Sequence, residues 1–160
     1  MKLVLDAIPL IYSAKTRVHS LFSRLNVELF TTDTVKAEVL KGDFEEKGVL
    51  ERLFAGEVKV LKAKGVFPSA RGLHSGEASA LALAKEKNAV LVSDDRVART
   101  VAKAMGVQVV YSNFFIFRAL EKKVVDAGEA KALVEELVES GWWCDAETLA
   151  RIFNAIEKYV

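Results

Sequence analysis

The chain has 160 residues, one of them cysteine, with 51% hydrophobic and 28% charged residues and a formal net charge of +1. These values predict one soluble domain over residues 1–160. They exclude an internal disulfide and a nucleic-acid binder that depends on strong overall basicity, and no apolar run approaches the roughly 18 residues of a membrane span. We expect a cytoplasmic protein, because no basic-then-apolar leader precedes a cleavage site.

Short apolar strands alternate with helical segments along the chain. The strands are predicted at Lys2–Leu5, Val27–Phe30, Val58–Leu61, Ala89–Val92 and Val107–Tyr111. Helices are predicted after Asp6, over Val18–Leu25, around Val35–Leu40, over Phe44–Phe54, from Ser75, from about Arg96, up to Leu120, over Asp126–Glu139 and after Asp145, with a loop at Lys62–Leu73. This alternation predicts an α/β fold: a three-layer α/β/α domain with a central parallel sheet of about five strands and a helical C-terminal extension over about 126–160.

The most informative stretch begins at Ser75, which is placed to cap a helix. Glu77 falls in the first turn of that helix, where the helix dipole favours a negative charge. The apolar strand Ala89–Val92 follows and leads into Ser93, Asp94 and Asp95. Ligands of open α/β sheets bind beyond the carboxyl ends of the strands, so acidic side chains lie where a ligand is expected.

Acidic residues from four separate segments are candidates for one site. Asp6 ends the first predicted strand, Asp94 and Asp95 follow the fourth, Glu77 opens the helix before it, and Glu38 lies within a helix elsewhere. If the first and fourth strands are neighbours at the switch point of the sheet, their acids converge on one crevice. Gathered carboxylates repel and need protons, basic partners or a hard cation, and an all-oxygen site favours Mg²⁺ or Mn²⁺ over zinc. The pattern indicates metal-assisted hydrolysis of a phosphodiester.

Each acidic residue also has an ordinary structural interpretation. Asp6 is a candidate helix N-cap, and one of Asp94 and Asp95 is expected to cap the helix that begins near Arg96. Glu77 is a candidate surface residue that complements the helix dipole, and Glu38 a solvated helix residue. Spacing alone leaves these alternatives open.

Four motifs resemble those of PIN domains, the nuclease fold of VapC-type toxin ribonucleases. They are Leu-Val-Leu-Asp6-Ala-Ile-Pro-Leu-Ile, Thr34-Val-Lys-Ala-Glu38-Val-Leu, Gly76-Glu77-Ala-Ser-Ala-Leu and Val92-Ser-Asp-Asp95-Arg-Val-Ala-Arg99. The resemblance is strongest to an archaeal and bacterial PIN subfamily labelled only as predicted nucleic-acid-binding protein. It implies metal-binding carboxylates at the positions of Asp6, Glu38, Glu77 and Asp95. Many relatives carry Asp at the third position, so Glu77 is a departure, and Ser93 matches the residue two before the fourth acid, which favours Asp95 over Asp94.

The resemblance implies an endoribonuclease that uses Mg²⁺ or Mn²⁺ to cut single-stranded RNA and leaves a 5′-phosphate and a 3′-hydroxyl. Asp6 and Asp95 would hold the ion, with Asp94 as the alternative ligand. Glu38 would orient or deprotonate the attacking water, and Glu77 would complete the metal shell. The family also implies a homodimer and a toxin–antitoxin system in which an antitoxin protein is the partner.

Three further residues are candidates for substrate binding. Ser93 is placed to hydrogen-bond a carboxylate or a metal-bound water, and Arg96 and Arg99 are placed to meet RNA phosphates. For both arginines the alternative is a salt bridge that holds the carboxylates of the site.

Two other functions compete with the nuclease. The first is a PIN-fold nucleic-acid-binding or scaffold protein with little or no nuclease activity, which the near-neutral charge and Glu77 favour. The second is an unrelated α/β enzyme or phospho-acceptor domain, but no Lys follows the fifth predicted strand, as a receiver-like domain would need. The chain also lacks a glycine-rich phosphate loop, which argues against binding of nucleoside triphosphates or dinucleotides.

Overall fold

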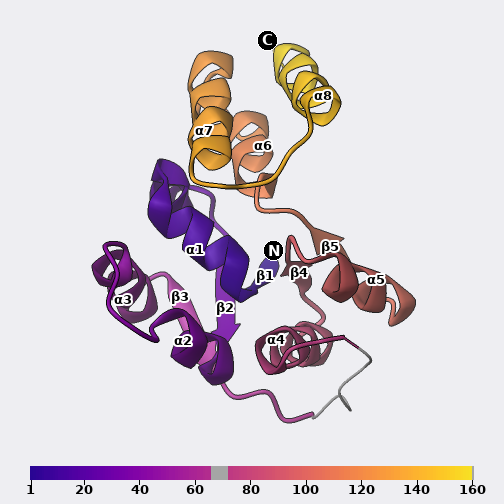
Figure 1. The fold of residues 1–160 in the computed structure, drawn as a ribbon. Coiled ribbons are helices and arrows are strands. Elements are labelled where there is room, and N and C mark those ends of the chain that lie inside the picture. The colour runs from indigo at the N-terminus through magenta and orange to yellow at the C-terminus, as the bar shows by residue number, and fades with distance from the viewer. Residues whose placement is uncertain (66–71, 160) are drawn as a thin grey trace. The chain divides into compact units, whose positions relative to one another are not determined.

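A computed structural model describes residues 1–65 and 72–159 (Figure 1). The predicted loop at Lys62–Leu73 therefore lies partly outside the described residues. The chain divides into two compact units. The first comprises Met1–Ile11 and Val27–Ser112, and the second comprises Tyr12–Asn26 and the described residues from Asn113 onward. That the two units form one domain with a helical extension stays a prediction.

The first unit is built on a five-stranded parallel sheet. Its strands are β1 (Lys2–Leu5), β2 (Glu28–Thr32), β3 (Val58–Leu61), β4 (Val90–Val92) and β5 (Val109–Val110). Their order across the sheet is β3-β2-β1-β4-β5, so the chain builds outward from β1 in one direction and then crosses to the other side (Figure 1). The central strand β1 is fully buried from Leu3 to Leu5, as a parallel strand covered on both faces should be.

Helices follow each strand and complete the predicted three-layer α/β/α arrangement. They are α1 (Ala7–Lys15), α2 (Asp33–Val39), α3 (Lys47–Ala55), α4 (Ser75–Glu86) and α5 (Arg96–Ala104). Helix α4 packs on strands β1, β2 and β4 through small and aliphatic side chains such as Ala80 and Leu81, both without exposed surface. The hydroxyl of Thr32 accepts a hydrogen bond from the N–H of Val35 and so caps the start of α2.

Several boundaries differ from the predicted ones for local reasons. Strand β2 extends to Thr32 because Thr31 and Thr32 pair with β3, opposite Val60 and Leu61. Strand β5 is much shorter than Val107–Tyr111, since it lies at the sheet edge and pairs only with the three-residue β4. Ser75 was expected to be the cap of α4, but the structure places His74 at the N-cap position and Ser75 inside the helix.

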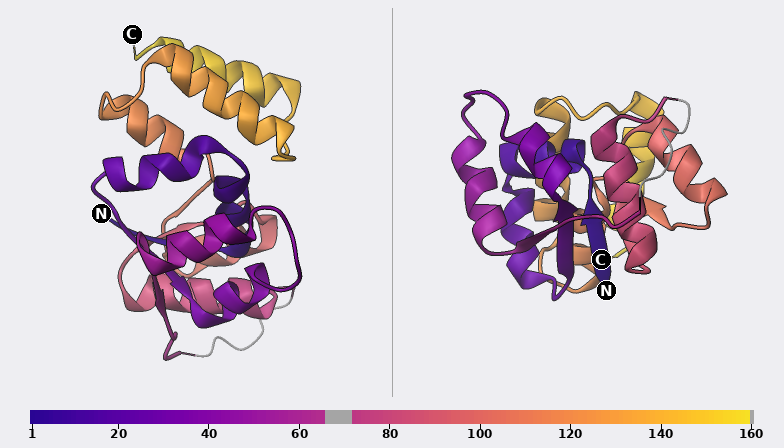
Figure 2. Two further views of the ribbon diagram at one scale, coloured as in Figure 1. Left: turned by 90° about the vertical axis from the view of Figure 1, so that its left-hand side faces the viewer. Right: turned by 90° about the horizontal axis from the view of Figure 1, so that it is seen from below.

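The second unit is helical. It contains the end of α1, a 3-10 helix η1 (Arg17–Arg24), α6 (Phe114–Glu121), α7 (Ala127–Glu139) and α8 (Ala146–Glu157), and α7 and α8 lie side by side (Figure 2). The rings of Phe22 and Phe115 meet with centroids 4.7 Å apart. Asp145 caps α8, the helix predicted to begin after it, and Asp126 caps α7 through a hydrogen bond from the N–H of Glu129. Within the described residues no helix combines the length and hydrophobicity needed to cross a membrane.

Candidate active site

The candidate site lies where the strand order reverses between β1 and β4. These strands pair in parallel with Leu5 opposite Val92, so the residues that follow them emerge together at the carboxyl edge of the sheet. The backbone N–H of Asp6 donates to the carbonyl of Val92 over 3.1 Å, and the hydroxyl of Ser93 donates to Oδ2 of Asp6 over 2.9 Å. The expected convergence of the two strand ends is therefore present, and Ser93 binds one of the predicted carboxylates.

Asp6 is a buried carboxylate with few compensating partners. Only 2% of its surface is exposed, and Oδ1 accepts a 2.8 Å hydrogen bond from the N–H of Ala7. Burial raises the pKa of Asp6 from 3.8 to about 6, although the hydrogen bonds from Ala7 and Ser93 act in the opposite direction. The negative charges of Glu77 and Glu38 raise this pKa further. A cation at this edge would relieve the cost of ionising Asp6.

Glu77 joins the same electrostatic group from helix α4. Its Oε2 accepts a 2.9 Å hydrogen bond from the N–H of His74, which closes a capping box at the start of the helix. Desolvation raises the pKa of Glu77, and the charges of Asp95 and Glu38 raise it further. The structure thus brings Asp6, Glu38, Glu77 and Asp95 close enough for their charges to interact.

Glu38 owes its position to a residue that the sequence patterns did not single out. Its carboxylate lies against Gly76, and a Cβ built on Gly76 would overlap Oε2 of Glu38. Gly76 is the second residue of α4, and its own φ does not require glycine. The sequence did contain one signal for this contact. Gly76 directly precedes the predicted ligand Glu77 and lies inside a predicted helix, where no turn requires a glycine.

Asp94 and Asp95 have different hydrogen-bond partners and therefore different roles. Oδ1 of Asp95 accepts a 2.7 Å hydrogen bond from the N–H of Ala98 and caps α5, while the N–H of Asp95 donates to Oγ of Ser93 over 3.3 Å. Asp94 instead accepts hydrogen bonds from the N–H and hydroxyl of Ser112, which follows β5. The structure therefore ties Asp94, predicted as an alternative metal ligand, to the end of β5, while the charge of Asp95 acts on Glu77.

The two predicted arginines differ. Arg96 is exposed, whereas Arg99 is partly buried: it donates a 3.0 Å hydrogen bond to the carbonyl of Ser93, and its guanidinium carbon lies 3.3 Å from the ring centroid of Tyr111. Neither forms a salt bridge with an acidic residue within the described part of the chain. The alternative interpretation, in which salt bridges from both arginines hold the carboxylates of the site, therefore does not describe this structure.

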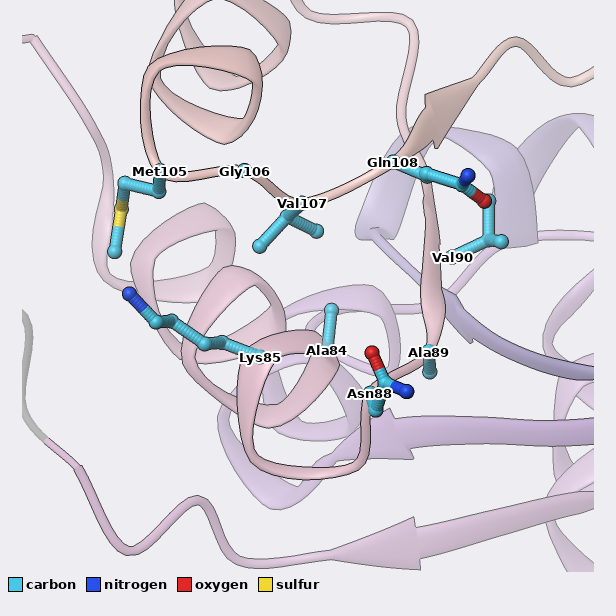
Figure 3. A pocket seen from close by; sticks show the side chains of 9 residues that line it. All are labelled: Ala84, Lys85, Asn88, Ala89, Val90, Met105, Gly106, Val107 and Gln108. Atoms are coloured by element: carbon cyan, nitrogen blue, oxygen red, sulfur yellow. The ribbon is translucent and has the colours of Figure 1, made fainter.

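Hollows lie at both ends of the sheet. One of about 550 Å³ is found at the amino ends of β4 and β5, where Lys85, Asn88, Met105 and Gln108 are among its lining residues (Figure 3). It contains none of the predicted site residues. Another, of about 420 Å³, includes Glu38 and is lined by Thr34, Ala37, Glu38, Lys41, His74 and Ser75. Of the four acidic residues, Glu38 is the one that lines this hollow.

Nearly the whole chain matches a known protein family. Residues 2–158 match the family described as DUF3368: PIN domain. The chain belongs to the PIN-domain family. The resemblance inferred from the four motifs is thereby confirmed.

The fold of this PIN domain is also that of a solved structure. A PilT N-terminus domain protein from the hyperthermophilic archaeon Sulfolobus solfataricus P2 superposes with a TM-score of 0.56 and 21% sequence identity, over 76% of this chain and 95% of that protein. Among curated proteins none matches this chain. PIN domains are generally nucleases that use divalent metal ions, so this chain has a nuclease-type fold.

The carboxylates of this PIN domain fit a hard divalent cation by their chemistry. They supply only oxygen donors, and burial, followed by neighbouring negative charge, raises the pKa values of Asp6 and Glu77. Within residues 1–65 and 72–159, no three His, Cys, Asp or Glu side chains already enclose a metal position. Glu77 and Asp95 each use one oxygen in a hydrogen bond at a helix N-terminus.

Proposed function

We propose that this PIN domain is an endoribonuclease that cuts single-stranded RNA with the help of Mg²⁺ or Mn²⁺. The observation that supports the proposal is the electrostatic coupling of four carboxylates from four separate segments at the β1–β4 switch point. Asp6 and Asp95 would hold the ion, and Glu77 would complete the set. When bound, a divalent cation neutralises charge on a phosphate oxygen and lowers the pKa of a water molecule.

Within this proposal each protein group has a defined task. Ser93 orients the carboxylate of Asp6 through its 2.9 Å hydrogen bond. Glu38, which is exposed and lines the 420 Å³ hollow, accepts the proton of the attacking water. The water oxygen bonds to phosphorus, the bond from phosphorus to the 3′ oxygen breaks, and that oxygen takes a proton from solvent. The products are a 5′-phosphate and a 3′-hydroxyl.

The decisive experiment compares purified wild type with Asp6→Asn and Asp95→Asn on single-stranded RNA, with Mn²⁺ and with a chelator. We expect metal-dependent cleavage by the wild type and none by either variant, with circular dichroism spectra unchanged. Cleavage at wild-type rates by both purified variants would remove the assigned roles of Asp6 and Asp95. The ends of the products, tested with a phosphatase and a 5′-phosphate-dependent exonuclease, check the direction of bond breaking.

A PIN-fold binding protein with little or no cleavage is the second candidate. It is favoured by the capping roles of Glu77 and Asp95, since each carboxylate already serves a helix N-terminus. It predicts that the wild type binds single-stranded RNA but leaves it intact at millimolar Mn²⁺. The cleavage assay therefore separates the two candidates without further variants.

A toxin role with an antitoxin partner, and a homodimeric state, belong to the same proposal and rest on the family resemblance. Induced expression in a bacterial host should slow growth for the wild type and leave growth normal for Asp6→Asn. Equal growth at equal protein levels would count against the toxin role. Light scattering of the purified chain tests for the dimer.

A further inference from the structure

Tyr111 presents an aromatic ring that contacts Arg99, a residue hydrogen-bonded to Ser93 of the candidate site. It follows β5 at the carboxyl edge of the sheet, and 48% of its surface is exposed. The guanidinium of Arg99 is stacked on this ring, with its central carbon 3.3 Å from the centroid. The pair therefore forms a cationic and aromatic surface, which we call the Arg99–Tyr111 platform.

The platform is joined to the candidate active site through Ser93. Arg99 donates to the carbonyl of Ser93 over 3.0 Å, and the hydroxyl of the same serine donates to Asp6. Arg99 also lies one turn after the N-cap residue Asp95, whose carbonyl accepts the N–H of Arg99 over 3.0 Å. Ser93 thus hydrogen-bonds both the carboxylate of Asp6, through its hydroxyl, and the guanidinium of Arg99, through its carbonyl.

Two other cation–ring pairs in this unit, both on Phe30, have a different character. Lys59 and Lys87 lie over the ring of Phe30, which is only 5% exposed, so these lysines cover a ring that the core already holds. Tyr111 is exposed although Arg99 lies on it, and a phenol ring at a sheet edge gains little from packing alone. A planar ligand would use this surface.

We propose that the Arg99–Tyr111 platform binds a nucleotide of single-stranded RNA next to the scissile bond, with the base stacked on Tyr111 and its phosphate paired with Arg99. Unpaired bases stack on aromatic rings and on arginine planes regardless of sequence, and the guanidinium adds attraction for the phosphate. This inference rests on the proposed function for its substrate class. It makes Tyr111 a binding residue that the sequence patterns did not single out.

The test measures binding separately from cleavage. Fluorescence anisotropy of a labelled single-stranded RNA, with a chelator present, gives Kd for wild type, Tyr111→Ala, Tyr111→Leu and Tyr111→Phe. We expect Ala and Leu to weaken binding by roughly 5- to 100-fold, the range that loss of one stacked base produces. Phe should bind within about twofold of the wild type, since it keeps the ring. The exposed Tyr159, which follows α8 in the other unit, supplies the matched control Tyr159→Ala, with no change in Kd expected.

A base-free RNA distinguishes stacking from a structural role. The same oligonucleotide with abasic positions should bind the wild type and Tyr111→Ala equally, because no base is left to stack. Equal Kd values of wild type, Tyr111→Ala and Tyr111→Leu for normal RNA, or no binding by the wild type, would overturn the proposal. So would an equal loss on normal and abasic RNA, which would indicate an altered fold.

The outcome is separable from that of the nuclease assay. A base-dependent loss in Tyr111→Ala together with no cleavage by the wild type keeps the platform and removes the nuclease. Metal-dependent cleavage together with unchanged Kd values keeps the nuclease and removes the platform. Arg99→Lys adds a second readout, since it keeps the charge and loses the planar stack, and we expect it to bind more weakly than the wild type.

Discussion

The carboxylate of Glu38 lies so close to Gly76 that a side chain on residue 76 would occupy the space of Oε2. This contact joins α2 to the first turn of α4, the turn that also carries Glu77. The first turn of α4 thus serves two of the four acidic residues: it carries Glu77, and its Gly76 leaves room for the carboxylate of Glu38. Glycine is needed at position 76 because the side chain of Glu38 comes close to it, and not because the backbone conformation requires glycine.

Gly76→Ala is therefore expected to act on Glu38 rather than on stability. Because the overlapping atom is the end of a flexible side chain, Glu38 can turn away, and alanine is the better helix former. We expect an unchanged or higher melting temperature and a loss of cleavage of roughly 10²-fold, as for displacement of a general base. Gly128 is likewise the second residue of its helix, and Gly128→Ala, whose Cβ would lie 3.3 Å from Asp126, is the matched control with normal cleavage. Normal cleavage by both variants would mean that the position of Glu38 is immaterial.

Asp6→Asn should stabilise the metal-free protein at neutral pH while abolishing cleavage. The folded state binds the proton of Asp6 more tightly than the unfolded state does, because the pKa of Asp6 rises from 3.8 to about 6 on folding. The stability of the wild type relative to Asp6→Asn is therefore greatest below pH 4 and is lost as the pH rises through about 6. The difference in unfolding free energy between pH 4 and pH 8 should approach ~3 kcal/mol. Urea unfolding with a chelator measures it, and a difference that does not vary with pH would contradict the burial of a charged Asp6.

Divalent cations should raise the melting temperature of the wild type. The raised pKa values of Asp6 and Glu77 show that their negative charges are costly in the folded state, and a ligand that binds only this state stabilises it. At about 100 times Kd the gain is ~2.7 kcal/mol. Differential scanning fluorimetry with Mn²⁺, with Ca²⁺ for comparison and with Asp6→Asn as the control, tests this. An absence of any shift at millimolar Mn²⁺ would argue strongly against a shared site.

Asp95 separates capping from catalysis. Asparagine caps helices as well as aspartate, so Asp95→Asn should keep the hydrogen bond to Ala98 and the stability of α5. We expect cleavage to be lost all the same, because the amide removes a negative charge from the site. Asp126 caps α7 through the same kind of bond, to Glu129, and Asp126→Asn should leave cleavage unchanged. Equal activity of these two variants would reduce Asp95 to a structural cap.

The sequence was most informative where a residue's role depends on its near neighbours. The helix start at Asp145 follows from side-chain chemistry at helix N-termini, and the parallel sheet follows from alternating strand and helix signals. The pairing of β1 with β4, on which the convergence of the acidic residues depends, entered the sequence argument as a condition, and the structure shows it.

What remained hidden depends on contacts between distant segments. The approach of Gly76 to Glu38 and the stacking of Arg99 on Tyr111 are set by how helices and strand ends pack in three dimensions. The position of Tyr111 also depends on where the edge strand β5 ends, which its sequence of apolar residues does not define. At α4, the cap hydrogen bond comes from a carboxylate three residues downstream, so the polar residue Ser75 was a misleading signal.

The bond between Glu77 and the backbone amide of His74 has a consequence for spectroscopy. A ligand that draws Oε2 away from this amide would let the amide exchange with solvent faster and would change its chemical shift. A single nitrogen-15 resonance, that of residue 74, would therefore report occupancy of the centre in solution even in a variant that cuts nothing.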